Sequence, residues 1–368
     1  MQIFHFILDH RIGGPHVYVK TIRDCLSPRL LSTIVTTGVG PLTDMSLTNL
    51  RHQHKLLYPF EVICNVFRLC WWFHSRNLRS GAIFDVHGAA NVAPLLAARL
   101  LGIPVVWHFH ETVADFSILV KLGKLALKNT LHRYVVVAEK SAEVFKIESP
   151  HFIPGSVDVA FWRRGGNKAE SAVRLTSSNL RLIAVGNLNP LKGIDNLLVA
   201  LGGLDITWEL VIVGSELSTF SQYASALRAQ ANILTQNSCR VDFVGWQAPA
   251  AVRDLIAHAD VFVLPSRSEA CPIALLEAMA MECACVASAV GDVERILGGG
   301  MECGITVPAE SPEALTNALK HVASLSENGR RELGRRARAR IVSSYSNTKL
   351  AQRHLDMYLE LVQDTGRS

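Results

Sequence analysis

This 368-residue chain lacks several sequence features, and each absence excludes a class of protein. No segment reaches the roughly 18 to 20 uninterrupted apolar residues of a membrane-spanning helix, although apolar residues make up 49% of the chain. The opening residues lack the basic stretch and small-residue cleavage site of a signal peptide, so we expect a first buried strand at 2–8. The sequence therefore predicts a globular, cytoplasmic protein.

Metal-binding and dinucleotide-binding motifs are also absent. The eight cysteines include no C-x-x-C pair and no His/Cys spacing typical of zinc, and most lie in apolar runs. We expect reduced thiols and no bound metal. The glycine pair Gly13-Gly14 follows the first apolar run, but the pattern is not G-x-G-x-x-G. Such a pair allows a ligand to approach the backbone, although it is more often a simple turn.

Charge is unevenly distributed along the chain. Residues 1–165 contain 18 Lys and Arg against 11 Asp and Glu, whereas the remainder is slightly acidic and the whole chain carries +5. A basic first half favours an anionic partner, which composition leaves open among acidic lipid headgroups, a phosphorylated acceptor and nucleic acid.

The length and the polar stretch 163–179 indicate two domains joined by a linker. We place a first domain at 1–165, a second at 166–345, and a terminal helix at 346–368. Strand-like and helix-like runs alternate in both halves, which is typical of an α/β protein with parallel sheets.

The most informative stretch is residues 260–280, DVFVLPSRSEACPIALLEAMA. It predicts a buried strand at 261–264, a turn at 265–272 and a helix that begins near Ile273. Ligands in open α/β sheets bind at the carboxyl ends of strands, and a helix N-terminus there suits a phosphate. Two carboxylates, Glu269 in the turn and Glu277 in the helix, can accept hydroxyl hydrogen bonds. Taken alone, an E-x7-E pair is more often a solvated glutamate in a turn followed by a glutamate in the first turn of a helix, where the helix dipole favours it.

The words SEACPIALLEAMA closely resemble the E-x7-E segment of the retaining glycosyltransferases of family 4. That resemblance implies the GT-B architecture, in which two Rossmann-like domains face each other across a cleft. It also implies transfer of a sugar from a nucleotide diphosphate donor to a glycan or lipid-linked acceptor in cell-envelope glycan synthesis, with no nucleic acid as partner. The resemblance is strong over the second domain, whereas in the first domain it is limited to short segments.

The resemblance also implies roles for individual residues in the second domain. Glu269 is expected to hold sugar hydroxyls and Glu277 the ribose. The loop VGNLNPLKG matches a family loop that binds the diphosphate through Arg and Lys, but here Asn187 stands at the Arg position and Lys192 at the Lys position. The other expected donor contacts are Gly245, Trp246, Cys271, Ile273, Ala274 and Leu275.

In the first domain, the family's glycine pair falls at Gly14 and its neighbour. The segment VVWHFH resembles the strand whose terminal histidine contacts the donor sugar, which is His110 in this chain. Since no D-x-D motif is present, the resemblance implies metal-independent catalysis without a cofactor. Two alternatives remain open, an epimerase or phosphorylase on the same fold and a catalytically silent protein that binds nucleotide sugar or an anionic surface.

Residues 56–79 combine aromatic and basic side chains. A helix carrying Phe67, Trp71 and Trp72 beside Arg68 and Arg76 is compatible with a membrane interface on the inner face of the cell membrane. The same helix is compatible with an ordinary core helix of the first domain.

Overall fold

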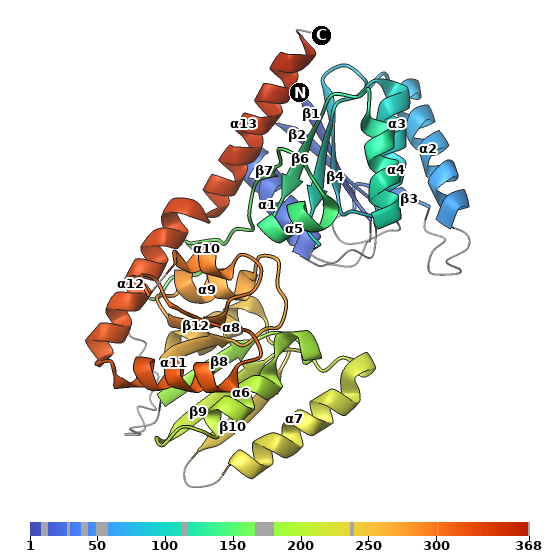
Figure 1. Ribbon diagram of the computed structural model, residues 1–368. Coiled ribbons are helices and arrows are strands. Elements are labelled where there is room, and N and C mark those ends of the chain that lie inside the picture. The colour runs from blue at the N-terminus through green and yellow to red at the C-terminus, as the bar shows by residue number, and fades with distance from the viewer. Residues whose placement is uncertain are drawn as a thin grey trace. The chain divides into compact units, whose positions relative to one another are not determined.

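The computed structural model describes residues 1–8, 14–27, 30–37, 43–48, 58–111, 117–165, 180–235, 239–299 and 301–366 (Figure 1). The chain forms two compact units. The first comprises Met1–Gly155 and Asn347–Ser368, and the second comprises Ser156–Ser346. Each unit contains one parallel sheet with helices on its faces, as the alternating sequence pattern predicts.

The sheet of the first unit has the strand order β3-β2-β1-β4-β5-β6-β7. The strands are β1 (Gln2–Ile7), β2 (Leu31–Thr37), β3 (Met45–Leu47), β4 (Ala82–His87), β5 (Val105–Phe109), β6 (His132–Val136) and β7 (His151–Phe152). The helices are α1 (Gly14–Leu26), α2 (Tyr58–Ser75), α3 (Val92–Leu101), α4 (Ser117–Leu127), α5 (Glu139–Phe145) and α13 (Asn347–Thr365).

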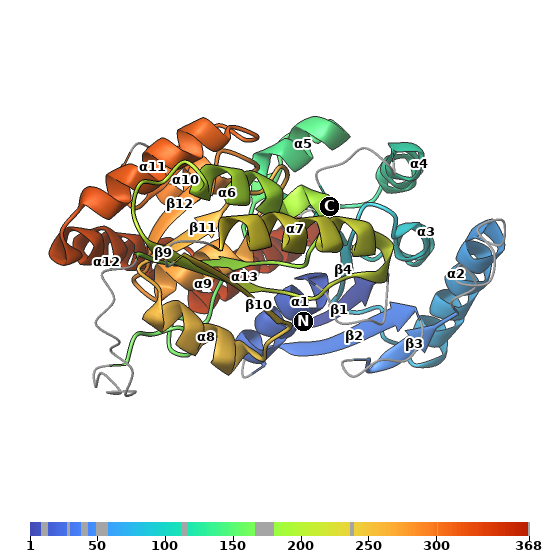
Figure 2. The same cartoon turned by 90° about the horizontal axis from the view of Figure 1, so that it is seen from below.

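Helices cover both faces of this sheet. Helices α2, α3 and α4 pack side by side on one face, while α1 and α13 pack together on the other (Figures 1 and 2). Strands β4 and β5 are buried along their whole length, because each lies between two neighbouring strands and between two helical layers.

The second unit contains a parallel sheet with the order β10-β9-β8-β11-β12-β13. Its strands are β8 (Leu180–Val185), β9 (Trp208–Val213), β10 (Arg240–Gly245), β11 (Val261–Leu264), β12 (Ala284–Ser288) and β13 (Ile305–Val307). Its α-helices are α6 (Ile194–Leu201), α7 (Ser221–Leu234), α8 (Pro249–His258), α9 (Ile273–Ala280), α10 (Val293–Leu297), α11 (Pro312–Ser324) and α12 (Glu327–Ser344), and the short 3₁₀ helices are η2 (Pro190–Lys192) and η3 (Ser218–Phe220). The strand and helix predicted within 260–280 begin at Val261 and Ile273 as expected.

The units divide earlier than the predicted boundary at 165. Trp162 is buried in a core of the second unit, and Val157 forms a bridge with Ser346, so both residues belong to that unit. Most of the predicted linker, residues 166–179, lies outside the described part of the chain. At the other end, the terminal helix α13 belongs to the first unit, where it packs on α1.

Helix α2 is neither wholly core nor wholly surface. Its buried side is formed by Glu61, Asn65, Leu69 and Phe73. Its other side exposes Phe60, Ile63, Phe67 and Trp71, which follow one another at the spacing of a single helical face. None of the helices in the described part of the chain combines the length and apolar character that a bilayer crossing requires.

A buried carboxylate attaches α13 to the sheet. Asp85 on β4 is fully buried, and its Oδ2 accepts hydrogen bonds from His5 Nδ1 at 2.8 Å and from Tyr358 Oη of α13 at 2.6 Å. Burial opposes ionisation of this carboxyl, but the imidazoles of His108 and His87 nevertheless hold its pKa well below the usual range. Asp85 is therefore a buried anion that depends on the surrounding donors.

We expect Tyr358→Phe to lower the free energy of unfolding by about 1.5 to 3 kcal/mol, because a hydrogen bond to a buried charge is lost. Urea denaturation measures the change. Leu359→Ala, at a neighbouring half-exposed position of α13, is the control and should cost much less. Equal losses in the two variants would show that the bond to Asp85 contributes no specific stability.

Candidate functional site

A pocket of about 390 Å³ lies in the second unit, at the carboxyl ends of β8 and β11. The last residues of those strands and the segments that follow them form its walls. Ten residues line it, namely Val185, Gly186, Asn187, Lys192, Leu264, Glu269, Cys271, Pro272, Ile273 and Ala274. The structure thus brings together six of the residues predicted from the sequence, from two segments about 80 positions apart, which is the usual ligand position in open α/β sheets.

Lys192 and Glu269 form the charged part of this pocket. Lys192 Nζ donates to Glu269 Oε1 at 2.7 Å, and Ser266 Oγ donates to the same oxygen at 2.8 Å. Both partners of the ion pair are partly exposed, so a ligand can reach them. An ammonium group beside a carboxylate can bind a phosphate oxygen and a sugar hydroxyl at adjacent positions.

Arg267 fixes the loop that carries Lys192. Its guanidinium makes a bidentate ion pair with Asp195 of α6, at 2.8 Å and 2.7 Å, and donates to the carbonyl oxygen of Pro190 at 2.6 Å. A bidentate pair of this kind restricts both position and orientation. Neither residue was identified from the sequence, since nothing in a lone Arg and a lone Asp 72 positions apart indicates their contact.

Gly193 allows the same loop to approach the turn after β11. Its φ is +62°, and a Cβ at this position would lie 2.0 Å from the carbonyl oxygen of Pro265. Any other residue would push the loop away from the turn and carry Lys192 with it.

Asn187, which replaces the expected Arg, has a structural contact of its own. Its Oδ1 accepts a hydrogen bond from the backbone amide of Ser215 at 3.1 Å, so it ties the loop after β8 to the loop after β9. It lines the pocket without contributing a positive charge. Within the described lining, Lys192 is therefore the cationic side chain.

The amino end of α9 lies at the pocket, and the first amides of a helix have no acceptor within the helix. Ile273 and Ala274 line it, whereas the side chain of Leu275 is buried and its amide donates to Pro272 within the first turn at 3.1 Å. Glu277 lies one turn further along α9, and burial raises its pKa to about 8. A carboxyl with such a pKa is protonated at neutral pH until a ligand or a cation favours its charged form.

The remaining predicted donor residues lie elsewhere. Gly245 ends the edge strand β10, and the side chain of Trp246 beside it is 70% exposed. Gly14 is the first residue of α1 in the first unit, and Gly13 lies outside the described residues. These three residues do not line the pocket in the second unit.

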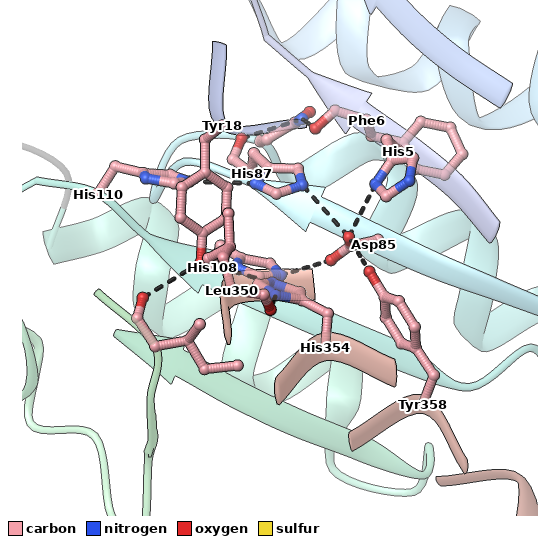
Figure 3. A network of polar contacts seen from close by, with 12 residues as sticks. His5, Phe6, Tyr18, Asp85, His87, His108, His110, Leu350, His354 and Tyr358 are labelled. Carbon is pink, nitrogen blue, oxygen red and sulfur yellow. Dashed lines mark hydrogen bonds and ion pairs between the residues drawn. The ribbon is translucent and has the colours of Figure 1, made fainter. Parts of the chain in front are cut away.

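His110 follows β5 in the first unit and belongs to a cluster of imidazoles around Asp85 (Figure 3). Strands β1, β4 and β5 contribute His5, His87 and His108, and α13 contributes His354 and Tyr358. Burial lowers the pKa of His87 to about 3 and that of His354 to about 4, and it also holds the pKa values of His108 and His110 below their usual range. These four imidazoles are neutral at physiological pH. Of this cluster the sequence indicated only His110, because the other members are distant in the chain or carry no motif.

Two groups in this cluster bring possible metal ligands within 4.8 Å of one another, His87-His108-His110 and His5-Asp85-His87. In the first group, the rings of His87 and His108 are stacked with centroids 4.2 Å apart and an angle of 22° between their planes. Nitrogen lone pairs lie in the ring planes, so two nearly parallel rings must rotate before they can share an ion. In the second group, Asp85 Oδ2 already accepts from His5 and Tyr358. The observed arrangement favours a hydrogen-bonded network.

Comparison with known proteins shows what the second unit is similar to. Residues 179–324 match the family model described as Glycosyl transferases group 1. A D-inositol 3-phosphate glycosyltransferase from Kineococcus radiotolerans is 28% identical over 232 residues, which cover 58% of this chain and 52% of that protein. The N-acetyl-alpha-D-glucosaminyl L-malate synthase of Bacillus anthracis is 22% identical over 206 residues, covering 55% and 51%. The chain therefore matches about half the length of these relatives.

Solved structures resemble the chain over nearly its whole length. A glycosyltransferase from Rickettsia africae has a TM-score of 0.83 at 17% identity and covers 98% of each chain. Alr3699/HepE from Anabaena, solved in complex with UDP, has a TM-score of 0.82 at 16% identity, covering 98% of this chain and 100% of that one. Together with the parallel sheets of both units, these matches show that the chain has the fold of the GT-B glycosyltransferases and that its residues 179–324 are similar to the glycosyl transferases group 1 family.

Proposed function

We propose that this protein is a glycosyltransferase that moves a sugar from a nucleotide diphosphate sugar to a glycan or lipid-linked acceptor. The observation that carries the proposal is the pocket at the ends of β8 and β11, where the Lys192–Glu269 ion pair and the N-terminus of α9 lie together. The family match of the surrounding residues and the similar structure that holds UDP support a nucleotide-sugar donor.

The proposed chemistry follows from the charges of the pocket. A departing nucleoside diphosphate gains negative charge on its phosphate oxygens, and Lys192 together with the amides of α9 can stabilise that charge. The family resemblance suggests a reaction that retains the configuration of the sugar by front-face substitution and proceeds without a metal. It also suggests that Glu269 holds sugar hydroxyls and that His110 contacts the sugar.

The proposal is tested by incubating the protein with UDP-, GDP- and ADP-sugars and measuring release of the nucleoside diphosphate. We expect turnover with one of these donors. Glu269→Gln should reduce kcat by roughly a hundredfold while donor affinity changes less, because sugar contacts strengthen as the glycosidic bond breaks. Glu302→Gln, at an exposed carboxylate of the same unit, is the control. Turnover in Glu269→Gln equal to that of the control would contradict the site assignment.

A second prediction concerns the pH dependence of nucleotide binding. The carboxyl of Glu277 has a pKa of about 8 in the free protein. Ribose hydroxyls donate to its charged form, so below that pKa binding must release a proton. Affinity for UDP should therefore rise as the pH increases from roughly 6 to 8, by at most about tenfold per pH unit, and then level off.

Titration calorimetry in two buffers with different heats of ionisation measures both the affinity and the proton release. Glu277→Gln should bind UDP more weakly and should lose the pH dependence between these values. If the variant keeps the slope of the unaltered protein, another group titrates and Glu277 does not contact the nucleotide.

We further propose that the first unit contacts an anionic membrane at the inner face of the cell. Helices α2, α3 and α4 are adjacent (Figure 2). Each exposes apolar side chains, namely Phe60, Ile63, Phe67 and Trp71 on α2, Leu100 on α3, and Ile118, Leu122 and Leu125 on α4. Exposed basic residues, including Arg68, Arg76, Arg79 and Lys121, lie on or next to the same helices, and residues 1–165 carry a net +7. Apolar side chains beside basic groups suit a lipid headgroup region.

The two adjacent tryptophans of α2 provide a matched test. Trp71 is 68% exposed, whereas Trp72 packs edge-on against Phe4 with ring centroids 5.7 Å apart. Trp71→Ala should weaken binding to vesicles containing phosphatidylserine and leave the melting temperature unchanged. Trp72→Ala should instead lower stability, by up to about 3 kcal/mol.

Vesicle sedimentation at low and physiological salt measures the binding, which should fall as salt screens the basic residues. Absence of vesicle binding by the unaltered protein at low salt would contradict the membrane proposal. That result would leave the proposed transfer reaction unaffected.

A further inference from the structure

Asp85 is connected to His110 through a single intervening imidazole. His87 Nε2 lies 3.4 Å from Asp85 Oδ2, and His87 Nδ1 lies 3.0 Å from His110 Nε2 (Figure 3). His87 and Asp85 are buried, whereas His110 is partly exposed. The three residues form a chain that runs from the interior of the first unit to an accessible side chain at the end of β5.

The carboxylate determines which nitrogen of His87 carries the proton. A neutral imidazole has one N–H and one lone pair. If the lone pair were on Nε2, it would face the Asp85 carboxylate at 3.4 Å in a buried environment, and the two would repel. With the proton on Nε2, that edge of the ring is attracted to the carboxylate. His87 Nδ1 is then a hydrogen-bond acceptor.

The same reasoning applies to His110. An acceptor at His87 Nδ1 requires a donor at His110 Nε2, 3.0 Å away. We propose that Asp85 and His87 are positioning residues that hold His110 in its Nε2–H tautomer, so that its Nδ1 offers a lone pair to a hydroxyl group of the ligand. Burial holds the pKa values of both His87 and His110 below their usual range, so each ring is neutral and carries one proton, whose position the neighbouring groups determine.

Other groups around His110 are compatible with this assignment. The ring of Tyr18 meets that of His110 edge to face, with centroids 5.1 Å apart, and its hydroxyl donates to the carbonyl of Ile153. The carboxylate of Glu111 accepts from the backbone amide of His110 at 3.1 Å. His108 uses Nε2 toward Asp85 Oδ1 at 2.5 Å, so the carboxylate's second oxygen is directed to a different ring.

The tautomer of His110 determines the direction of its hydrogen bond to the ligand. A sugar hydroxyl that meets His110 Nδ1 donates its proton there and does not accept one. A deoxy sugar or a sugar ether at that position would lose the contact, which makes the Asp85-His87 pair a determinant of specificity as well as of orientation. This part of the inference rests on the proposed function, whereas the tautomer of His110 does not.

The experiment is long-range ¹H–¹⁵N correlation NMR of the full-length protein without ligand, which distinguishes the two neutral tautomers of each histidine. We expect His110 as Nε2–H in the unaltered protein. His87→Phe keeps an aromatic ring stacked on His108 but removes the acceptor nitrogen Nδ1. The His110 resonances should then move toward a mixture of tautomers. His5→Phe removes another donor to Asp85 that is not on the path to His110, and it should leave the His110 tautomer unchanged.

An Nδ1–H tautomer in the unaltered protein would overturn the inference, and so would an unchanged His110 in a folded His87→Phe variant. Under the donor assay, His87→Phe should lower kcat by roughly tenfold, with a smaller change in KM, whereas His5→Phe should retain turnover. An expected tautomer together with no turnover for any donor would reject the proposed function and leave the positioning role intact.

Discussion

Parallel strands impose the constraint on which the rest of this structure depends. Two parallel neighbours cannot be joined by a tight turn, so the chain must return through a helix before the next strand begins. All strands of a sheet then point the same way, and the segments after them meet at one edge. In the second unit this constraint brings the loops after β8 and β11 into one pocket, although Lys192 and Glu269 are far apart in the chain. In the first unit it places His87 and His110 together.

Local patterns were sufficient to predict the fold class and several individual elements of this fold. The run Val261–Leu264 is apolar and β-branched, and Ile273 begins a helix after a proline, so burial and backbone stereochemistry determine both boundaries. The strand, turn and helix pattern predicted a ligand site at the turn after β11, but the presence of Lys192 in that site was predictable only because the sequence resembled a known family. Periodicity alone predicts only that Glu269 lies in a turn. A local pattern contains no information on the contact of Glu269 with Lys192, which is 77 positions away.

Interactions between distant side chains could not be predicted in the same way. The bidentate pair of Arg267 with Asp195 joins a turn to a helix, and each residue alone is an ordinary surface ion. The cluster around Asp85 draws on three strands and the terminal helix. Its members are polar residues in apolar strands, which was the available signal, because a buried carboxylate has to find donors somewhere in the fold. The partners themselves follow only from the sheet order.

The two units surround a buried carboxyl group with different numbers of hydrogen-bond donors. Asp85 is fully enclosed but is surrounded by N–H and O–H donors, so it remains ionised and gives a direction to the imidazoles next to it. Glu277 is partly buried, and none of the described residues offers it comparable donors, so burial raises its pKa to about 8. A carboxylate with its donors in place organises a network permanently, while one without them becomes charged when a ligand brings the donors. The first arrangement suits positioning a side chain, and the second suits recognising a diol. Under the proposed function, a carboxyl group thus has a fixed role in the first unit and a ligand-dependent role in the second.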